Sequence, residues 1–277
     1  MKRIALTLVA VLISFLIYIV GAYFTLESNL FPTAIQDTVR SYISLNFFSP
    51  AKANQSLKNA PNFTAKKNSY LNSEYRYPTH LKSVHIGSVQ LLEVELKVAN
   101  NSGGHTIFLL DDGVYELTKT IDIKSDHIIM SSTSGQPENV IIQGSQHKNT
   151  GIGNLFRVTG NHFVIDGITL QNAKNHLIQI AGESDADYPV IRNSILQDAY
   201  QQLLKVSYDL NRKPEISSDF GLIENNIFQY TDGIGPNFYI GGVDLHAGNS
   251  WIIRNNTFLD IASPGDKIAE HAIHVWN

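Results

Sequence analysis

Short apolar runs alternate with turn-forming residues over most of this chain. From Thr106 onward the runs are three to five residues long and rich in β-branched residues, and groups of Gly, Asn, Asp and Ser separate them. Runs of this kind are typical of β-strands, and no long helical pattern follows them. The pattern therefore predicts an all-β fold from about Thr106 to the end of the chain.

One series of these runs repeats. Four segments superimpose without gaps, with starts 26, 32 and 30 residues apart: VIDGITLQNA from Val164, VIRNSILQDA from Val190, LIENNIFQYT from Leu222 and IIRNNTFLDI from Ile252. Self-similarity at such periods is the signature of a solenoid. One slot holds only glycine or asparagine, residues that enter the left-handed backbone region at low cost, so we expect a sharp bend there. The residues in this slot are Gly167, Asn193, Asn225 and Asn255.

A second series lies between the first. Its members are LFRVT from Leu155, LIQIA from Leu177, LLKVS from Leu203, GVDLH from Gly242 and AIHVW from Ala272. Apolar residues alternate with variable ones, as in a strand with one buried face. The two series together predict a coil of three strands per repeat, with Asn226 and Asn256 in an internal side-chain ladder.

This combination resembles the right-handed parallel β-helix superfamily, to which pectate lyases belong. The resemblance covers roughly residues 86–277, and within it GHTIFLLDDGVYELTKTIDIKSDHIIMSS is similar to a first coil. A sandwich or a propeller is the alternative, but antiparallel hairpins would need recurring two-residue turns that the repeats lack. The resemblance implies an all-β, right-handed parallel β-helix, normally with further coils beyond Asn277, so we expect the chain to be truncated at its C-terminal end.

A helix is expected ahead of the strands. In SVQLLEVELKVANNSGG, Val89, Leu92, Leu96 and the Val98/Ala99 pair lie near one helical face. Ser88 is a candidate N-cap, and Gly103 and Gly104 would end the helix. In the related β-helices such a helix caps the open end of the core.

The first 24 residues predict a transmembrane or signal helix. Lys2 and Arg3 precede an apolar run from Ile4 to Phe24, which at 21 residues can just span a bilayer. Positive charge ahead of the run favours an N-terminus in the cytoplasm and the rest of the chain in the periplasm or outside the cell, and the length of the run favours an uncleaved membrane anchor. The alternative is a cleaved signal peptide and a secreted protein. Residues 25–85 are rich in Asn, Ser, Lys and Pro and predict a linker or stalk.

Composition narrows the function. A net charge of −4 without a long Lys/Arg run argues against a nucleic-acid binder. The chain has no cysteine, which excludes disulfides and thiolate metal sites. The oligomeric state is left open by these features.

Side-chain alternation sorts the second series into outward columns. The first column reads Arg157, Gln179, Lys205, Asp244 and His274, and the second, two residues further on, reads Thr159, Ala181, Ser207, His246 and Trp276. Long loops at 207–221, 229–242 and 259–272 flank the same strands. These loops would wall a groove with Tyr230, Phe238, Tyr239, Glu270 and His271.

Such a set suits proton abstraction at C5 of a uronic acid, next to its carboxylate. Lys205 would neutralise the carboxylate, His246 or His274 would be the base, and Tyr239 the acid. Asp244 would orient a histidine or keep Lys205 charged. Four further residues are expected to bind substrate: Arg157, Gln179, Trp276 and His271.

Asp244-Leu245-His246 is similar to the Asp-Pro-His arrangement of mannuronan C5-epimerases, which are also β-helices. The resemblance implies roles for Asp244 and His246, and for Lys205 and Tyr239. Two features differ, because Leu245 replaces the proline and Tyr239 stands five residues before Asp244. We therefore expect an exported enzyme acting on an acidic polysaccharide as a lyase or epimerase. The alternative is a non-catalytic glycan-binding or scaffold β-helix.

No cofactor is expected, although a divalent metal is a rival interpretation. Asp244, His246, Glu270, His271 and His274 contain enough nitrogen and oxygen ligands for one ion. However, His271 and His274 are three residues apart, which on a regular strand places them on opposite faces. We therefore expect His271 to belong to a loop and predict no metal site.

Overall fold

A computed structural model describes residues 75–144, 151–211, 216–265 and 270–276. The chain divides into two compact units, 1–68 and 69–277, and every described residue belongs to the second. The predicted transmembrane or signal helix at 1–24 and most of the predicted linker lie outside the described residues. Among the helices that are described, none has the length and apolar character needed to cross a membrane.

Three sheets, here named A, B and C, form the described unit, and every strand pair in them is parallel. Sheet A consists of β1 (Lys82–Ile86), β2 (Thr106–Leu110), β5 (Ile128–Ser132), β8 (Val164–Asp166), β11 (Val190–Arg192), β14 (Leu222–Glu224) and β17 (Ile252–Arg254). Sheet B consists of β3 (Gly113–Glu116), β6 (Val140–Gln143), β9 (Thr169–Ala173), β12 (Ile195–Ala199), β15 (Ile227–Gln229) and β18 (Thr257–Leu259). Sheet C consists of β4 (Ile121–Ile123), β7 (Phe156–Val158), β10 (Ile178–Ala181), β13 (Gln202–Ser207), β16 (Gly241–His246) and β19 (His271–Trp276).

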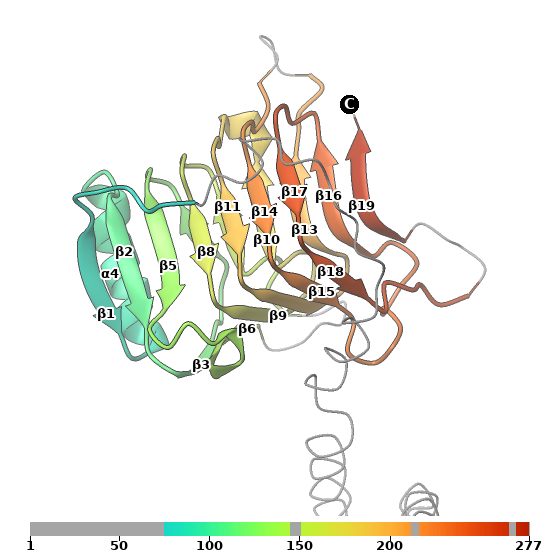
Figure 1. Cartoon of the computed structure of the whole chain (residues 1–277), viewed down its shortest axis with the longest axis horizontal. Coiled ribbons are helices and arrows are strands. Elements are labelled where there is room, and N and C mark those ends of the chain that lie inside the picture. The colour runs from blue at the N-terminus through green and yellow to red at the C-terminus, as the bar shows by residue number, and fades with distance from the viewer. Residues whose placement is uncertain (1–74, 145–150, 212–215, 266–269, 277) are drawn as a thin grey trace, which may run out of the picture. The chain divides into compact units, whose positions relative to one another are not determined.

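From β2 onward the chain visits sheets A, B and C in turn, so each turn of the chain adds one strand to each sheet (Figure 1). This is a parallel β-helix, as the repeats predicted. Val164, Val190, Leu222 and Ile252 lie opposite one another in sheet A, which confirms the gapless alignment of the first series. The right-handed sense of the coil stays a prediction, favoured by the strong right-handed preference of parallel crossovers.

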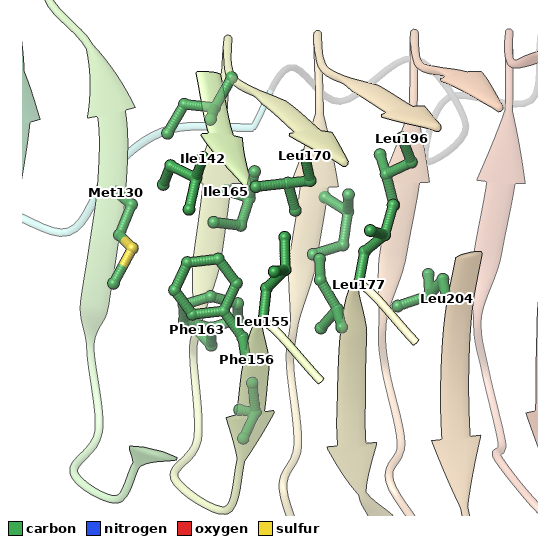
Figure 2. Close-up of a cluster of buried hydrophobic side chains, with 14 of the residues drawn as sticks. Met130, Ile142, Leu155, Phe156, Phe163, Ile165, Leu170, Leu177, Leu196 and Leu204 are labelled. Atoms are coloured by element: carbon green, nitrogen blue, oxygen red, sulfur yellow. The ribbon is translucent and has the colours of Figure 1, made fainter. Parts of the chain in front are cut away.

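The core fills the inside of the coil. Figure 2 shows side chains from all three sheets converging on one interior, among them Met130 of β5, Ile142 of β6 and Phe156 of β7. These three side chains are fully buried. Strands of three to six residues are too short to be stable alone. Burial of each large apolar side chain contributes about 1.5–3 kcal/mol, so stacking of coils stabilises the fold.

The bends between sheets A and B lie at the predicted slot. Gly167, Asn193, Asn225 and Asn255 have left-handed φ angles of 71°, 50°, 58° and 56°. The next slot forms the predicted amide ladder. Asn226 donates to the carbonyl of Ile191 at 2.8 Å and accepts the backbone N–H of Ser194 at 3.0 Å, and Asn256 accepts the backbone N–H of Asn226 at 3.0 Å. These bonds satisfy backbone groups that the bend removes from the sheets.

Helix α4 (Val89–Asn101) lies at the β1 and β2 end of the coil (Figure 1). The Ser88 hydroxyl accepts the backbone N–H of Leu91, the N-cap bond that the sequence predicts. Leu92, Leu96 and Ala99 are buried against the core, whereas Val98 is 47% exposed. The predicted apolar face was therefore wrong at Val98, because Ala99 occupies the position that points inward.

Strand β1 extends the coil beyond the expected boundary at residue 86. Lys82 to Ile86 pair with Thr106 to Leu110 of β2, so five residues join sheet A, four of which the pattern assigned to the linker. The segment before β1 also contacts sheet A, where the Tyr77 hydroxyl donates to Asp166 at 2.5 Å. The predicted linker therefore ends before Tyr77.

A stack of rings runs along the corner directly before sheet A. Its members occupy one slot of successive coils, all with left-handed φ between 49° and 58°, and their neighbouring ring centroids are 4.3–5.0 Å apart. They are His105, His127, His162, Tyr188 and Phe220, named here the corner stack. The preceding slot holds acids and amides whose side-chain oxygens accept backbone N–H groups of the next coil. These hydrogen bonds and ring contacts hold successive corners in register.

Candidate active site

The outward face of sheet C carries the first predicted column in register. Arg157, Gln179, Lys205, Asp244 and His274 lie opposite one another in consecutive strands from β7 to β19. Two pairs of the second column are also in register, because Ala181 lies opposite Ser207 and His246 opposite Trp276. Side chains far apart in the sequence therefore share one surface.

Lys205, Asp244 and His246 form a connected cluster at the centre of this surface. The Lys205 Nζ donates to Asp244 Oδ2 at 2.5 Å and lies 2.5 Å from His246 Nε2. His246 Nε2 is 3.2 Å from Asp244 Oδ1. The Asp244 side chain is only 1% exposed and that of Lys205 12% exposed, so both charges are largely removed from water. A buried carboxylate needs such partners to stay ionised.

The cluster sets the charge states of its members. Burial would raise the pKa of Asp244, but the hydrogen bond and charge of Lys205, together with His246 and Trp276, hold the pKa below its usual value. Burial and the charge of Lys205 lower the pKa of His246, and Asp244 only partly opposes them. At neutral pH the imidazole is therefore neutral. Because an ammonium group has only donor protons, we assign the His246 Nε2 as the acceptor of the Lys205 hydrogen bond and the ring proton to Nδ1; the other tautomer would donate from Nε2 to Asp244 Oδ1.

Three more predicted residues contact Asp244. The Trp276 indole Nε1 donates to Oδ1 at 3.2 Å, and the His274 Nδ1 lies 3.5 Å from the same oxygen. The Tyr239 hydroxyl approaches Oδ2 at 3.5 Å. Burial and the charge of Asp244 raise the pKa of Tyr239, so its hydroxyl stays protonated at neutral pH. The side chain of His274 is 49% exposed, so the cluster is open to solvent on that side.

The prediction that His271 belongs to a loop was wrong. His271 is the first residue of β19, and its ring centroid is 5.1 Å from that of His274. The cause is a bend in the strands of sheet C. Leu203 and Leu204 are consecutive, and both are fully buried, so the strand turns between them. Residues three apart then face the same side, which regular alternation forbids.

The glycine pair of β16 makes the same bend. A Cβ on Gly242 would point into the core, 2.6 Å from the ring of Phe258. A Cβ on Gly241 would point to the outer face, 2.3 Å from the His271 Nε2. The imidazole of His271 therefore lies where a side chain at position 241 would be, across β16 and toward Asp244.

Two functional candidates escaped the sequence analysis. Gln202 is fully buried beside Tyr239, and the His176 Nδ1 lies 3.0 Å from the Gln202 carbonyl oxygen. Burial lowers the pKa of His176 to about 4, and the charge of Lys205 acts in the same direction. His176 and Gln202 each precede a pair of buried apolar residues, Leu177-Ile178 and Leu203-Leu204. The doubled apolar residues were the signal that the strand bends here.

The remaining predicted residues lie outside the cluster. Arg157 contacts Glu183 at 3.4 Å, and Gln179 accepts from Asn154 at 2.7 Å and donates to Ser207 at 3.3 Å. The side chain of Arg157 is 40% exposed, so it stays available to a ligand. Tyr230 was expected in a groove wall, but it is 1% exposed and its hydroxyl donates to the Gln201 carbonyl at 2.5 Å. That expectation was wrong, because the Tyr230 ring is part of the core.

Three of these residues also form a group of potential metal ligands. Asp244, His271 and His274 each offer one ligand atom, and the three atoms lie within 4.8 Å of one another. The sequence predicted no metal site, because regular alternation would put His271 and His274 on opposite faces of a strand and His271 was therefore assigned to a loop.

Comparisons with known proteins add little to the site. No protein-family model and no curated protein matches the chain. Among solved structures, an alginate lyase from Paenibacillus sp. str. FPU-7 is similar with a TM-score of 0.37 and 13% identity, over 71% of this chain and 98% of that chain. This TM-score is too low to support a conclusion about this chain. The fold is therefore identified from the strand pairing, and the candidate site from its side-chain contacts.

Proposed function

We propose that this chain acts on a uronic acid polysaccharide by removing the proton at C5, as a lyase or an epimerase. The observation that carries this proposal is the Lys205, Asp244 and His246 cluster, in which a cation, a buried carboxylate and a neutral imidazole lie within hydrogen-bonding distance. A scaffold does not require these groups to converge, whereas proton abstraction next to a carboxylate needs all of them.

Lys205 is suited to neutralise the substrate carboxylate. Two of its three ammonium protons face Asp244 and His246, which leaves one for a substrate oxygen. The pKa of a C5 proton falls when the adjacent carboxylate is neutralised, because the negative charge that develops in the transition state is then stabilised. Asp244 accepts a hydrogen bond from the lysine and holds it in position.

His246 is suited to be the base and Tyr239 the acid. When Lys205 binds the substrate carboxylate, it keeps its hydrogen bond to Asp244 and gives up the one to His246, so the His246 Nε2 becomes free to accept the C5 proton. The electron pair of the C5–H bond then moves into the carboxylate as an enolate. The Tyr239 hydroxyl, 3.5 Å from Asp244 and still protonated at neutral pH, supplies the second proton. His274, also beside Asp244 and half exposed, is the alternative base.

The destination of that second proton separates the two reactions. In a lyase the enolate pair forms a C4–C5 double bond, the C4–O bond breaks, and Tyr239 protonates the leaving oxygen. In an epimerase Tyr239 protonates C5 from the opposite face and no bond in the chain breaks. Arg157, Gln179, His271 and Trp276 are proposed to bind neighbouring sugars or their carboxylates.

The location of the enzyme is part of the same proposal. Lys2, Arg3 and the apolar run from Ile4 to Phe24 favour a membrane anchor with the β-helix in the periplasm or outside the cell, where such polysaccharides occur. Cleavage of the same segment and secretion is the alternative. Fractionation of cells that express the full chain separates these two outcomes.

The test is incubation of the full-length chain with alginate, pectate and glycosaminoglycans in deuterated water. Ultraviolet absorbance from an unsaturated uronide is expected for a lyase, and deuterium at C5 without cleavage for an epimerase. The Asp244→Asn variant is expected to lose about 100-fold or more of either signal, because Lys205 and His246 lose the carboxylate that positions them for acid–base catalysis. The exposed Asp111 offers a control, because Asp111→Asn changes the same charge away from the cluster.

Two outcomes would contradict the proposal. Wild type and Asp244→Asn could be equally inert on every uronide, or Asp244→Asn could be as active as wild type. If the inert wild type still retards on affinity gels that contain one of the polysaccharides, and Arg157→Ala abolishes this, the chain is a glycan-binding β-helix instead.

A further inference from the structure

Asp244 of β16 and His271 and His274 of β19 bring one carboxylate and two imidazoles together on the outer face of sheet C. We propose that these three side chains bind one divalent transition-metal ion, with zinc as the reference case. The proposal goes beyond the acid–base chemistry above, because binding of the ion depends on the geometry of the three ligands and not on turnover of any substrate.

The distances are close to those of a zinc site. Zinc binds imidazole nitrogen and carboxylate oxygen at about 2.0–2.2 Å, so ligand atoms in a tetrahedral site lie about 3.3 Å apart. The His274 Nδ1 and Asp244 Oδ1 are already 3.5 Å apart, and all three ligand atoms lie within 4.8 Å. Rotation of the side chains through about 1 Å completes the site, within the range of ordinary rotamer adjustment.

The backbone prepares this arrangement. The bend in sheet C puts His271 and His274 on one face, although they are three residues apart. Gly241 then leaves the space into which the His271 ring extends, since a Cβ there would be 2.3 Å from the His271 Nε2. Any other residue at 241 would displace the ring from Asp244.

The Asp244 carboxylate offers one oxygen to a metal ion. Its two oxygens have different partners. Oδ2 accepts from Lys205 at 2.5 Å, whereas Oδ1 faces His246, His274 and the indole of Trp276. An ion on Oδ1 therefore shares the carboxylate with Lys205 without displacing it.

The ligand set also selects the kind of metal. Imidazole suits zinc, copper, iron and nickel, whereas calcium takes six to eight oxygen ligands. Among the described residues of this cluster, Asp244 is the only carboxylate within reach. Three protein ligands leave a coordination position open, as in catalytic zinc sites. If the proposed function holds, a carboxylate oxygen of the uronic acid would occupy this position beside Lys205.

The test measures zinc binding to the full-length chain without substrate, by calorimetry and in competition with a chromogenic chelator. The protein is purified without a polyhistidine tag, because a tag would bind zinc itself. One ion per chain is expected. Removal of an outer-shell partner weakens metal binding roughly 10- to 100-fold. His271→Ala and His274→Ala remove direct ligands, so each is expected to weaken zinc binding by more than this. His85→Ala, an exposed histidine of β1, is the matched control and is expected to bind as wild type does.

Cobalt provides a second measurement. Cobalt in a tetrahedral or five-coordinate site of nitrogen and oxygen ligands gives visible absorbance that is expected to disappear in His271→Asn, a variant that keeps a polar side chain and so preserves the fold. Circular dichroism of each variant shows whether the β-helix is intact. The proposal is overturned if the wild type binds no zinc, or if the folded His271→Asn and His274→Ala variants bind it as tightly as wild type.

The metal site and the proposed function fail separately. Zinc binding without turnover of any uronide keeps the site and removes the enzymatic role. Turnover by a wild type that binds no zinc keeps the enzymatic role and removes the site.

Discussion

Two groups of three histidines lie on this β-helix, and they differ in what surrounds them. In the corner stack, His105, His127 and His162 repeat one slot of successive coils, with ring centroids 4.5 and 4.3 Å apart. The second group lies around Asp244 on the outer face of sheet C and consists of His246, His271 and His274. The first group comes from repetition, the second from convergence.

The acids beside the two groups explain the difference. Near the corner stack, the Asp126 and Asp187 carboxylates accept backbone N–H groups of Asn161 and Asp219, so they are used in holding the corner. In the cluster, Asp244 accepts from the side chains of Lys205 and Trp276. A solenoid produces rows of identical residues wherever a slot repeats. We interpret such a row as a candidate functional site only where a buried charged side chain and its counter-charge lie beside it.

The largest expected effect comes from breaking the cluster. Asp244→Leu leaves the largely buried Lys205 charge without its main partner, so we expect the free energy of unfolding to fall by about 3–5 kcal/mol. The double variant Lys205→Met/Asp244→Leu is expected to recover most of this loss, because both charges are then removed. Urea denaturation of the three proteins measures it.

The corner stack supplies the matched comparison. Asp126→Ala removes one hydrogen bond to the backbone N–H of Asn161, which is worth about 1 kcal/mol. If Asp244→Leu and Asp126→Ala lower the free energy of unfolding equally, Asp244 contributes no more to stability than the acids of the corner do.

The next effect is a dependence of stability on pH. Burial lowers the pKa of His176 to about 4, below the value of 6.5 expected in the unfolded chain. Between these values the unfolded state binds one more proton, so stability present above about pH 6.5 is lost as the pH falls toward 4, by on the order of 3 kcal/mol. Denaturation of wild type and His176→Gln at about pH 7.5 and 4.5, with chelator present, is expected to show a smaller loss in the variant.

His127 sharpens this prediction. Burial and the neighbouring imidazoles of the corner stack also lower the pKa of His127, so its stabilising effect is lost in the same direction as the pH falls. The ring is only half-buried, and the effect of His127→Gln on the pH dependence is therefore expected to be smaller than that of His176→Gln. The opposite order would contradict the environments described for the two rings.

A smaller effect is expected from Gly241→Ala. The added Cβ would lie 2.3 Å from the His271 Nε2, so the ring must move away from Asp244. We expect stability to fall by about 1–3 kcal/mol, as overpacking does, and zinc affinity to fall by about 10-fold. Gly87→Ala is the control, because its nearest neighbour, the Asp111 Oδ2, would be at an ordinary 3.5 Å. Unchanged zinc binding in Gly241→Ala would contradict the role given to the glycine.

The smallest effect is expected at the end of the corner stack. Phe220 has a φ of 58° and stacks on Tyr188 at 5.0 Å. Phe220→Ala loses the stacking, worth about 0.5–1.5 kcal/mol, and keeps the left-handed backbone. Phe220→Gly loses the same contact but removes a backbone strain of about 1–2 kcal/mol, so it is expected to be the more stable of the two. The reverse order in thermal denaturation would show that the backbone at this corner is not strained.

Most of the fold was predictable from the sequence. The four aligned segments place Val164, Val190, Leu222 and Ile252 opposite one another, as the strand pairs have them. Strand β1 was missed, because KSVHI at 82–86 has no counterpart in the repeats and stands next to a polar segment. Its place in sheet A comes from pairing with β2, which no local pattern announces.

The site was predictable in part. Lys205 and Asp244 were placed together because both occupy the same slot of the repeat, and the register confirms this. His271 was assigned to a loop, and His176 and Gln202 were not found. All three lie beyond the bend, where two consecutive residues face the core and the alternation on which the prediction depends is interrupted.

The sequence by itself determined the repeating strands, their register and the outward column, because side-chain alternation and the Gly/Asn bend are properties of a few neighbouring residues. Only the tertiary structure decided which groups meet around Asp244. Whether two successive residues both turn inward depends on how the next coil packs, as Gly242 against Phe258 and the His271 ring over Gly241 demonstrate. The same bend that interrupts the pattern brings His271 to the carboxylate.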